Sequence, residues 1–135
     1  MDTLGRILIV DDDPVLRLVA SEMLAQNGYA VTEAEDGVQA LHALEAEQPD
    51  LVVLDMLMPN KEGIETIRDI KSRWPDTRVV AISGGGKGLN TGYLLSIAKA
   101  LGADAVYEKP LRASGFLDIV RDTLGKHGSP VARAG

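Results

Sequence analysis

Four apolar runs of this sequence each end in a side chain that could take part in ionic chemistry. Asp11 and Asp12 follow the first run, Asp55 ends the second, Ser83 ends the third, and Lys109 follows the fourth. An ionised carboxylate is costly to bury without a partner, so a run that closes on one indicates a polar site. Neighbouring carboxylates also repel one another, and a divalent cation would relieve that repulsion. Oxygen ligands without histidine or cysteine favour a hard ion such as Mg²⁺ or Mn²⁺.

Asp55 is the candidate for covalent chemistry, because aspartate can accept a phosphoryl group as a nucleophile. Phosphoryl transfer depends mainly on positioning and on charge stabilisation. The Lys109 ammonium would supply one positive charge, and the Ser83 hydroxyl with nearby backbone N–H groups, such as that of Gly84, would donate hydrogen bonds. Asp13 next to Pro14 instead fits a helix N-cap.

The elements that must position these groups alternate along the chain. Apolar runs typical of buried strands occupy 6–11, 29–34, 51–55, 78–83 and 103–108. Helical periodicity follows each of them, and it assigns Val19 and Val38 to the buried stripes of the first two helices. Five strand–helix repeats predict an α/β fold with parallel strands and helices on both faces. The carboxyl ends of parallel strands share one edge of the sheet, which is where ligands bind in such folds.

Length and composition exclude several classes of protein. The chain has 135 residues, a net charge of −6, and no cysteine. One domain of ordinary size is therefore expected over 5–125, with a flexible tail over 126–135. The acidic balance argues against direct DNA binding and against a membrane-surface role. No signal peptide or membrane span is apparent, so a cytoplasmic protein is expected.

Taken together, these motifs resemble the receiver domain of two-component response regulators, of the stand-alone, chemotaxis-regulator-like type. The resemblance covers about residues 5 to 125. It rests on the following segments: Ile7 to Pro14, Asp55 to Pro59 with Gly63, Ser83-Gly84, and Lys109-Pro110. It implies a flavodoxin-like (βα)5 fold, a doubly wound parallel sheet with strand order 2-1-3-4-5.

The resemblance also implies roles for individual residues. Asp55 matches the phosphoacceptor, and Lys109 matches the phosphate-binding lysine with a cis bond to Pro110. Asp11 and Asp12 match the acidic pair that binds Mg²⁺ together with Asp55 and the backbone carbonyl of Leu57. Ser83, with Gly84, matches the hydroxyl position that moves toward the phosphoryl group. The implied phosphodonor is a phosphohistidine on a sensor histidine kinase or a histidine phosphotransfer protein, and the downstream protein partner is not specified.

Two positions depart from the family pattern. The switch position three residues before the lysine, usually aromatic, is Val106, and Tyr107 is one place late. Because successive strand residues face opposite sides of a sheet, Tyr107 is expected on the opposite face. Leu57 is apolar where many members are polar, so it cannot orient an attacking water, and slow self-dephosphorylation is expected.

Two other functions fit parts of the pattern. A magnesium-dependent phosphohydrolase could also act through an aspartyl phosphate. Such enzymes usually carry a second acidic residue two positions beyond the nucleophile, where this chain has Leu57. A receiver-like domain could instead bind partners without phosphorylation, but the full set of Asp11, Asp12, Asp55, Ser83 and Lys109 argues against that.

Overall fold

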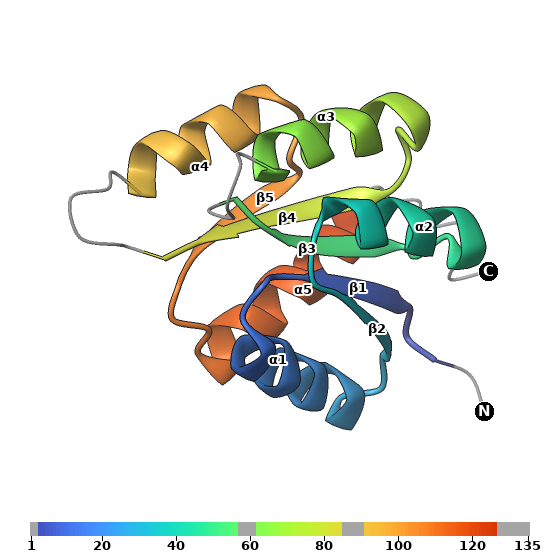
Figure 1. Cartoon of the computed structure of the whole chain (residues 1–135). Coiled ribbons are helices and arrows are strands. Elements are labelled where there is room, and N and C mark those ends of the chain that lie inside the picture. The colour runs from blue at the N-terminus through green and yellow to red at the C-terminus, as the bar shows by residue number, and fades with distance from the viewer. Residues whose placement is uncertain (1–2, 57–61, 85–90, 127–135) are drawn as a thin grey trace.

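We describe a computed structural model of the chain, covering residues 3–56, 62–84 and 91–126. Five parallel strands form one sheet in the order β2-β1-β3-β4-β5, which confirms the predicted fold class (Figure 1). The strands are β1 (Arg6–Val10), β2 (Ala30–Ala34), β3 (Leu51–Asp55), β4 (Arg78–Ser83) and β5 (Ala105–Glu108). β1, β3 and β4 lie in the interior of the sheet and are almost wholly buried, as expected for apolar runs with helices on both faces.

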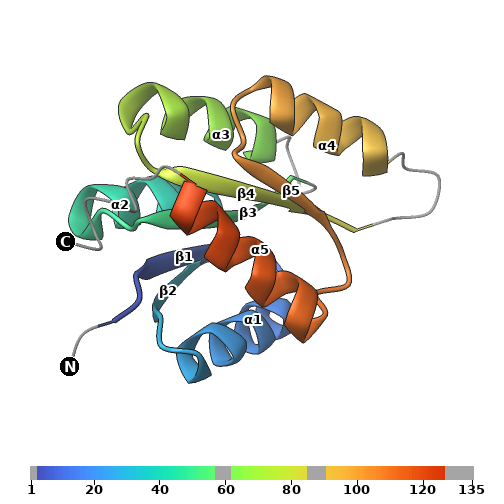
Figure 2. The same cartoon turned by 180° about the vertical axis from the view of Figure 1, so that it is seen from behind.

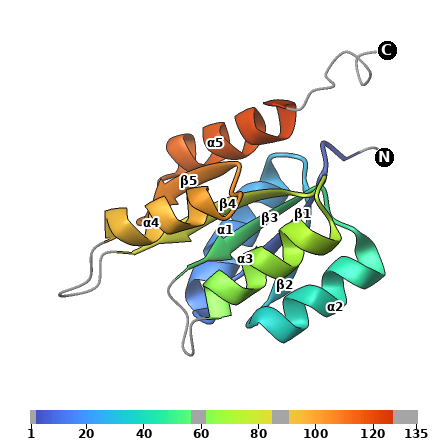
Figure 3. The same cartoon turned by 90° about the horizontal axis from the view of Figure 1, so that it is seen from above.

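Five helices cover the sheet in two layers. They are α1 (Pro14–Gln26), α2 (Gly37–Glu47), α3 (Glu62–Arg73), α4 (Thr91–Ala100) and α5 (Ala113–Lys126). α2, α3 and α4 lie on one face of the sheet, and α1 and α5 lie on the other, as the front, back and top views show (Figures 1, 2 and 3). None of the helices in the described ranges is long and apolar enough to cross a lipid bilayer.

Alternate residues of each central strand feed two separate hydrophobic cores. Leu8 and Val52 belong to the core beneath α2, α3 and α4. Ile9 and Val53 belong to the core beneath α1 and α5. Because both faces of the sheet are packed, a slip of one residue in any central strand would exchange the two sets of side chains, so the register is strongly fixed.

Two helices begin at aspartate caps. Asp13 accepts a hydrogen bond from the Val15 backbone N–H at 2.9 Å, and Asp36 accepts one from the Gln39 backbone N–H at 2.8 Å. Each carboxylate satisfies a backbone donor that the helix leaves unpaired. Asp13 is therefore accounted for by its role as the cap of α1.

Two predicted core positions are wrong. Val19 is 46% exposed and Val38 is 61% exposed, although periodicity assigned both to buried stripes. Both residues lie on the outward side of their helices. Ala20 and Leu24 bury the inner face of α1, and Ala40 and Leu44 bury that of α2. Apolar character at the edge of a helical stripe does not establish that the position is covered.

Candidate functional site at the carboxyl edge of the sheet

Three carboxylates meet where β1 and β3 end. Asp11 follows β1 and is fully buried, Asp55 is the last residue of β3 and is also buried, and Asp12 is exposed. One carboxylate oxygen from each lies within 4.8 Å of the others. The parallel order of β1 and β3 creates this cluster, because it brings both strand ends to the same edge.

Lys109 contacts this cluster from the end of β5. Its Nζ lies 3.1 Å from Asp11 Oδ2 and 3.5 Å from Asp55 Oδ2. Burial acts to lower the pKa of the ammonium, but the negative charges of Asp55 and Asp11 outweigh it and raise the pKa above its ordinary value. The ammonium is therefore charged throughout the neutral range. Its aliphatic stem passes over Gly84, where an added Cβ would lie 3.1 Å from Lys109 Cδ. The Lys109–Pro110 peptide bond is cis.

Ser83 ends β4 beside Lys109. The backbone N–H of Lys109 donates to the Ser83 carbonyl at 2.9 Å, which fixes the two residues relative to each other. The Ser83 Oγ is buried and makes no hydrogen bond to any described residue. A buried hydroxyl without a partner is unfavourable, so this group is available to donate to an incoming oxygen anion.

The donor set fits a hard divalent cation. Among the described residues, three carboxylates share this edge with one ammonium, so negative charge remains uncompensated. Asp11 Oδ2 is buried and, although it forms an ion pair with Lys109, it accepts no well-oriented hydrogen bond there. Mg²⁺ is bound in proteins by a few carboxylates with waters and phosphate oxygens, which matches an all-oxygen cluster of this size.

Gly63 explains how α3 can pack so closely behind Asp55. It lies in the first turn of α3, and a Cβ at this position would lie 2.7 Å from the Met56 Cα and 2.9 Å from the Asp55 carbonyl oxygen. α3 therefore packs directly on the backbone that carries Asp55. The sequence motif includes Gly63, but the close approach of the two backbones is visible only in the structure.

Arg17, which belongs to none of the sequence motifs, also contacts the site. Its Nη1 donates to the Asp11 backbone carbonyl at 2.7 Å from α1. Its position one turn after the cap of α1 was the available signal, since side chains there point back toward the helix N-terminus. Leu57 lies outside the described residues, so the role of its backbone carbonyl stays a prediction.

Val106 and Tyr107 face opposite sides of β5. Val106 packs with the core beneath α2, α3 and α4, whereas Tyr107 packs with the core beneath α1 and α5. The Tyr107 ring meets Phe116 edge-on with 6.0 Å between the ring centroids. The aromatic side chain of β5, that of Tyr107, therefore lies on the face of the sheet that α1 and α5 cover.

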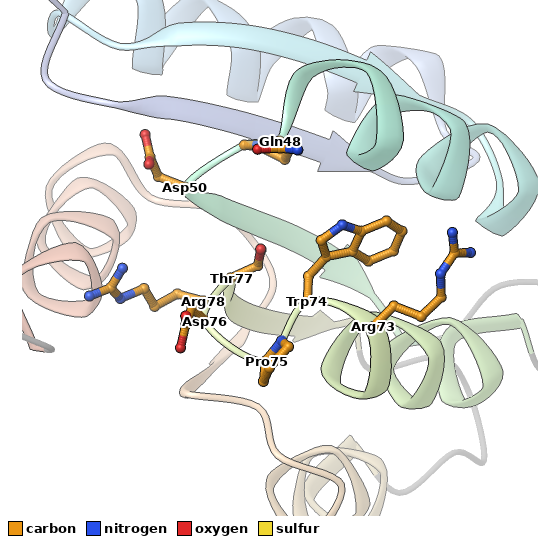
Figure 4. Close-up of a pocket in the computed structure, with 9 residues that line it drawn as sticks. Gln48, Asp50, Arg73, Trp74, Pro75, Asp76, Thr77 and Arg78 are labelled. Carbon is orange, nitrogen blue, oxygen red and sulfur yellow. The ribbon is translucent and has the colours of Figure 1, made fainter.

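Two grooves differ in their relation to this site. The first, of about 390 Å³, adjoins it and is lined by Asp13, Val15, Leu16, Val19, Gly84, Lys109, Pro110 and Leu111. We call it the α1 groove. The second, of about 410 Å³, lies at the opposite, amino edge around Trp74 and Arg78 (Figure 4). The Arg73 guanidinium carbon lies 4.4 Å from the centroid of the Trp74 ring, and Arg73 pairs with Glu45. None of the residues that line this groove belongs to the acidic cluster.

The fold and site together define a class, namely flavodoxin-like α/β proteins with an acidic cluster and a lysine at the carboxyl edge of the sheet. The family model described as "Response regulator receiver domain" matches residues 7–121. The chain belongs to the response regulator receiver domain family.

Comparisons with individual proteins agree with this assignment. The chain is 34% identical to Chemotaxis protein CheY of Bacillus subtilis over 120 residues, 88% of this chain and 97% of that protein. It is also 34% identical to Sporulation initiation phosphotransferase F of the same organism over 122 residues, 90% of this chain and 92% of that protein. A CheY-like receiver domain protein from Methanospirillum hungatei superimposes with a TM-score of 0.82 at 27% identity, covering 92% of this chain and 96% of that one.

A further structural match shows the domain inside a longer protein. NtrX from Brucella abortus, in complex with ADP, superimposes with a TM-score of 0.85 at 29% identity, over 99% of this chain but 29% of that one. The chain therefore spans less than a third of NtrX and nearly the full length of the two Bacillus proteins.

Proposed function

We propose that this receiver domain is a phosphorylation-switched signalling module that accepts a phosphoryl group from a phosphohistidine onto Asp55. The observation that supports the proposal best is the placement of the buried Asp55 carboxylate beside the Lys109 ammonium, 3.5 Å away, within a cluster of three carboxylates. A buried nucleophile with a fixed positive charge next to it suits phosphoryl transfer, where positioning and charge neutralisation supply most of the catalysis.

The transfer assigns a task to each residue. An Asp55 oxygen forms a bond to phosphorus while the bond from phosphorus to the imidazole nitrogen breaks, and the electron pair leaves with the imidazole. The Lys109 ammonium stabilises negative charge on the phosphoryl oxygens, and the Ser83 hydroxyl, which bonds to none of the described residues, donates a hydrogen bond to one of them. Asp11, Asp12 and Asp55 would hold Mg²⁺, which when bound supplies further charge neutralisation at the phosphoryl group.

The partner that carries the phosphohistidine would dock on the α1 groove. The groove includes Lys109 and Gly84, so a protein seated there reaches the Asp55 site directly. Val15, 66% exposed, and Val19, 46% exposed, offer apolar surface beside it. Exposed apolar side chains gathered at a groove mark an interaction surface. A sensor histidine kinase or a histidine phosphotransfer protein is the partner class proposed.

Changing Val19 to Asn should slow transfer from such a partner about tenfold, because burying the exposed part of a valine side chain contributes about 1 kcal/mol and burying an amide in its place is unfavourable. Phosphorylation by acetyl phosphate should stay unchanged, since it needs no docking. Val38→Asn is the matched control, a more exposed valine on α2 that does not line the groove. Equal transfer rates for the two variants would contradict the proposed docking surface.

Slow self-dephosphorylation is a further expectation. Leu57→Asn would place a polar group two residues after Asp55, able to orient a water for attack on the phosphoryl group. The half-life of the phosphorylated chain should become shorter in this variant. An unchanged or longer half-life would count against a role for Leu57.

The proposed function is tested by intact mass after incubation with acetyl phosphate, with Mg²⁺ and with the metal removed by a chelator. We expect one base-labile phosphoryl adduct that requires Mg²⁺. Rapid release of phosphate from acetyl phosphate without an adduct would favour the phosphohydrolase. No adduct, either from acetyl phosphate or from a phosphohistidine donor, would favour a domain that binds partners without phosphorylation.

A further inference from the structure

One guanidinium group joins three elements next to the acidic cluster. Arg17 lies on α1 with its side chain only 16% exposed. Its Nη1 donates to the Asp11 backbone carbonyl at 2.7 Å, and its Nε donates to Glu33 Oε1 on β2 at 3.1 Å. The second Glu33 oxygen accepts from Ser21 Oγ, also on α1, at 3.0 Å. Arg17 therefore links α1 to β2 through Glu33, and it links α1 to the segment after β1 through the Asp11 carbonyl.

The carbonyl that Arg17 binds belongs to the peptide between Asp11 and Asp12. Because a peptide unit is planar, fixing this carbonyl also fixes the direction in which the chain continues to Asp12. Three other contacts fix the position of Asp11. Its backbone N–H donates to the Ala34 carbonyl at 3.2 Å, and its Oδ1 accepts from the Asp13 N–H at 2.9 Å. Its Oδ2 forms an ion pair with Lys109. Asp12 is exposed, and no described residue forms a hydrogen bond or ion pair with its carboxylate.

We propose that Arg17 is a positioning residue for the metal site. By fixing the Asp11–Asp12 peptide, it keeps the otherwise unheld Asp12 carboxylate within reach of Asp11 and Asp55. The inference rests on the proposed function, because it assigns Arg17 a role toward the cation that these carboxylates would bind. Groups that orient metal ligands from outside the ligand shell commonly change metal affinity 10- to 100-fold when they are removed.

In Arg17→Gln, loss of the positive charge and loss of the hydrogen bond to Asp11 are expected to change Mg²⁺ affinity in opposite directions. The substitution removes a positive charge beside an acidic cluster, and this alone would strengthen the binding of a cation. Loss of the bond to the Asp11 carbonyl would release Asp12 and weaken binding. We expect Mg²⁺ affinity, measured by titration calorimetry on the metal-free chain, to fall about tenfold in Arg17→Gln, consistent with outer-shell effects.

Two controls separate this role from a purely structural one. Glu33→Gln removes the charge of the ion pair between α1 and β2 but keeps an amide oxygen that can accept from Arg17 Nε. It leaves the Arg17 bond to Asp11, so Mg²⁺ affinity should stay close to native. Arg121→Gln removes an equal charge on α5, where Arg121 pairs only with Asp118 and Asp122 among the described residues, and should also leave affinity unchanged. Urea unfolding of each metal-free variant reports stability separately.

A double-mutant cycle with Asp12→Asn tests the route of the effect. If Arg17 acts through Asp12, Arg17→Gln should cost little further Mg²⁺ affinity in the Asp12→Asn background. Additive losses would overturn the inference, as would native-like or tighter Mg²⁺ binding by Arg17→Gln. If Arg17→Gln fails to fold, Arg17→Lys replaces it, and Mg²⁺ affinity is again expected to fall. Lysine keeps the positive charge but lacks the planar guanidinium that bonds to Glu33 and to the Asp11 carbonyl at the same time.

Failure of the inference is distinguishable from failure of the proposed site. Native chain that binds Mg²⁺, with Asp12→Asn weakened and Arg17→Gln unaffected, would overturn the role of Arg17 alone. Native chain that binds no Mg²⁺ at millimolar concentration would overturn the metal site and, with it, this inference.

Discussion

Replacing Asp55 with Asn should abolish phosphorylation of the chain completely. The carboxamide is close in shape to the carboxylate but lacks the anionic oxygen that attacks phosphorus. Neither Asp11 nor Asp12 should substitute for it, because both oxygens of Asp11 are engaged, Oδ1 by the Asp13 N–H and Oδ2 by Lys109, and Asp12 lies at the exposed rim. The measurement is intact mass after incubation with acetyl phosphate and Mg²⁺, followed by base treatment of any adduct.

Asp13→Asn is the matched control for this experiment. It makes the same chemical change two residues beyond Asp11, and Asn caps a helix about as well as Asp, so α1 should be undisturbed. This variant should gain the same adduct as the native chain. An adduct of undiminished yield in folded Asp55→Asn would contradict the assignment of Asp55 as the phosphoacceptor.

Gly63→Ala should destabilise the chain by about 2 kcal/mol and slow its phosphorylation. The added Cβ would lie 2.7 Å from the Met56 Cα and 2.8 Å from its carbonyl oxygen. These are backbone atoms that cannot turn aside, so either α3 or the strand end must shift. Overpacking of this kind costs about 1–3 kcal/mol, partly offset by the better helix propensity of alanine. Urea unfolding and the initial rate of adduct formation are the two measurements.

Gly125→Ala is the control for Gly63→Ala. It also lies within a helix, α5, and a Cβ there would meet no atom within 4 Å. It should stabilise the chain by about 0.5–1 kcal/mol, because alanine favours helix over glycine. If Gly63→Ala proved as stable as Gly125→Ala, the close packing of α3 on the Asp55 backbone would not hold.

Much of the fold was predictable because the central strands are unambiguous. A strand buried on both faces must be apolar throughout, and Leu51 to Leu54 meets that condition without interruption. Helix starts were predictable where a cap residue such as Asp13 precedes them. The exposure of Val19 was not predictable, because it depends on whether a neighbouring element covers that side of α1, and periodicity carries no such information.

The candidate site also contains residues that could be predicted from the sequence and residues that could not. Asp11, Asp55 and Lys109 could be predicted because strand ends of a parallel sheet must meet at one edge. The contact of Arg17 with the Asp11 carbonyl could not, because it depends on how α1 packs beside β2. The need for glycine at position 63 could not be predicted either. It comes from the short distance between the backbones of α3 and of the segment that carries Asp55, and tertiary packing sets that distance.

The placement of Tyr107 bears on how such a domain can evolve. In a strand, exchanging the aromatic residue between 106 and 107 moves its bulk from one helix layer to the other. Doing so one substitution at a time passes through intermediates that are both unfavourable. Losing Tyr107 first removes its ring contact with Phe116, and gaining an aromatic at 106 first adds bulk at a half-buried position against the core beneath α2, α3 and α4. We therefore expect the residues at 106 and 107 to change together rather than singly.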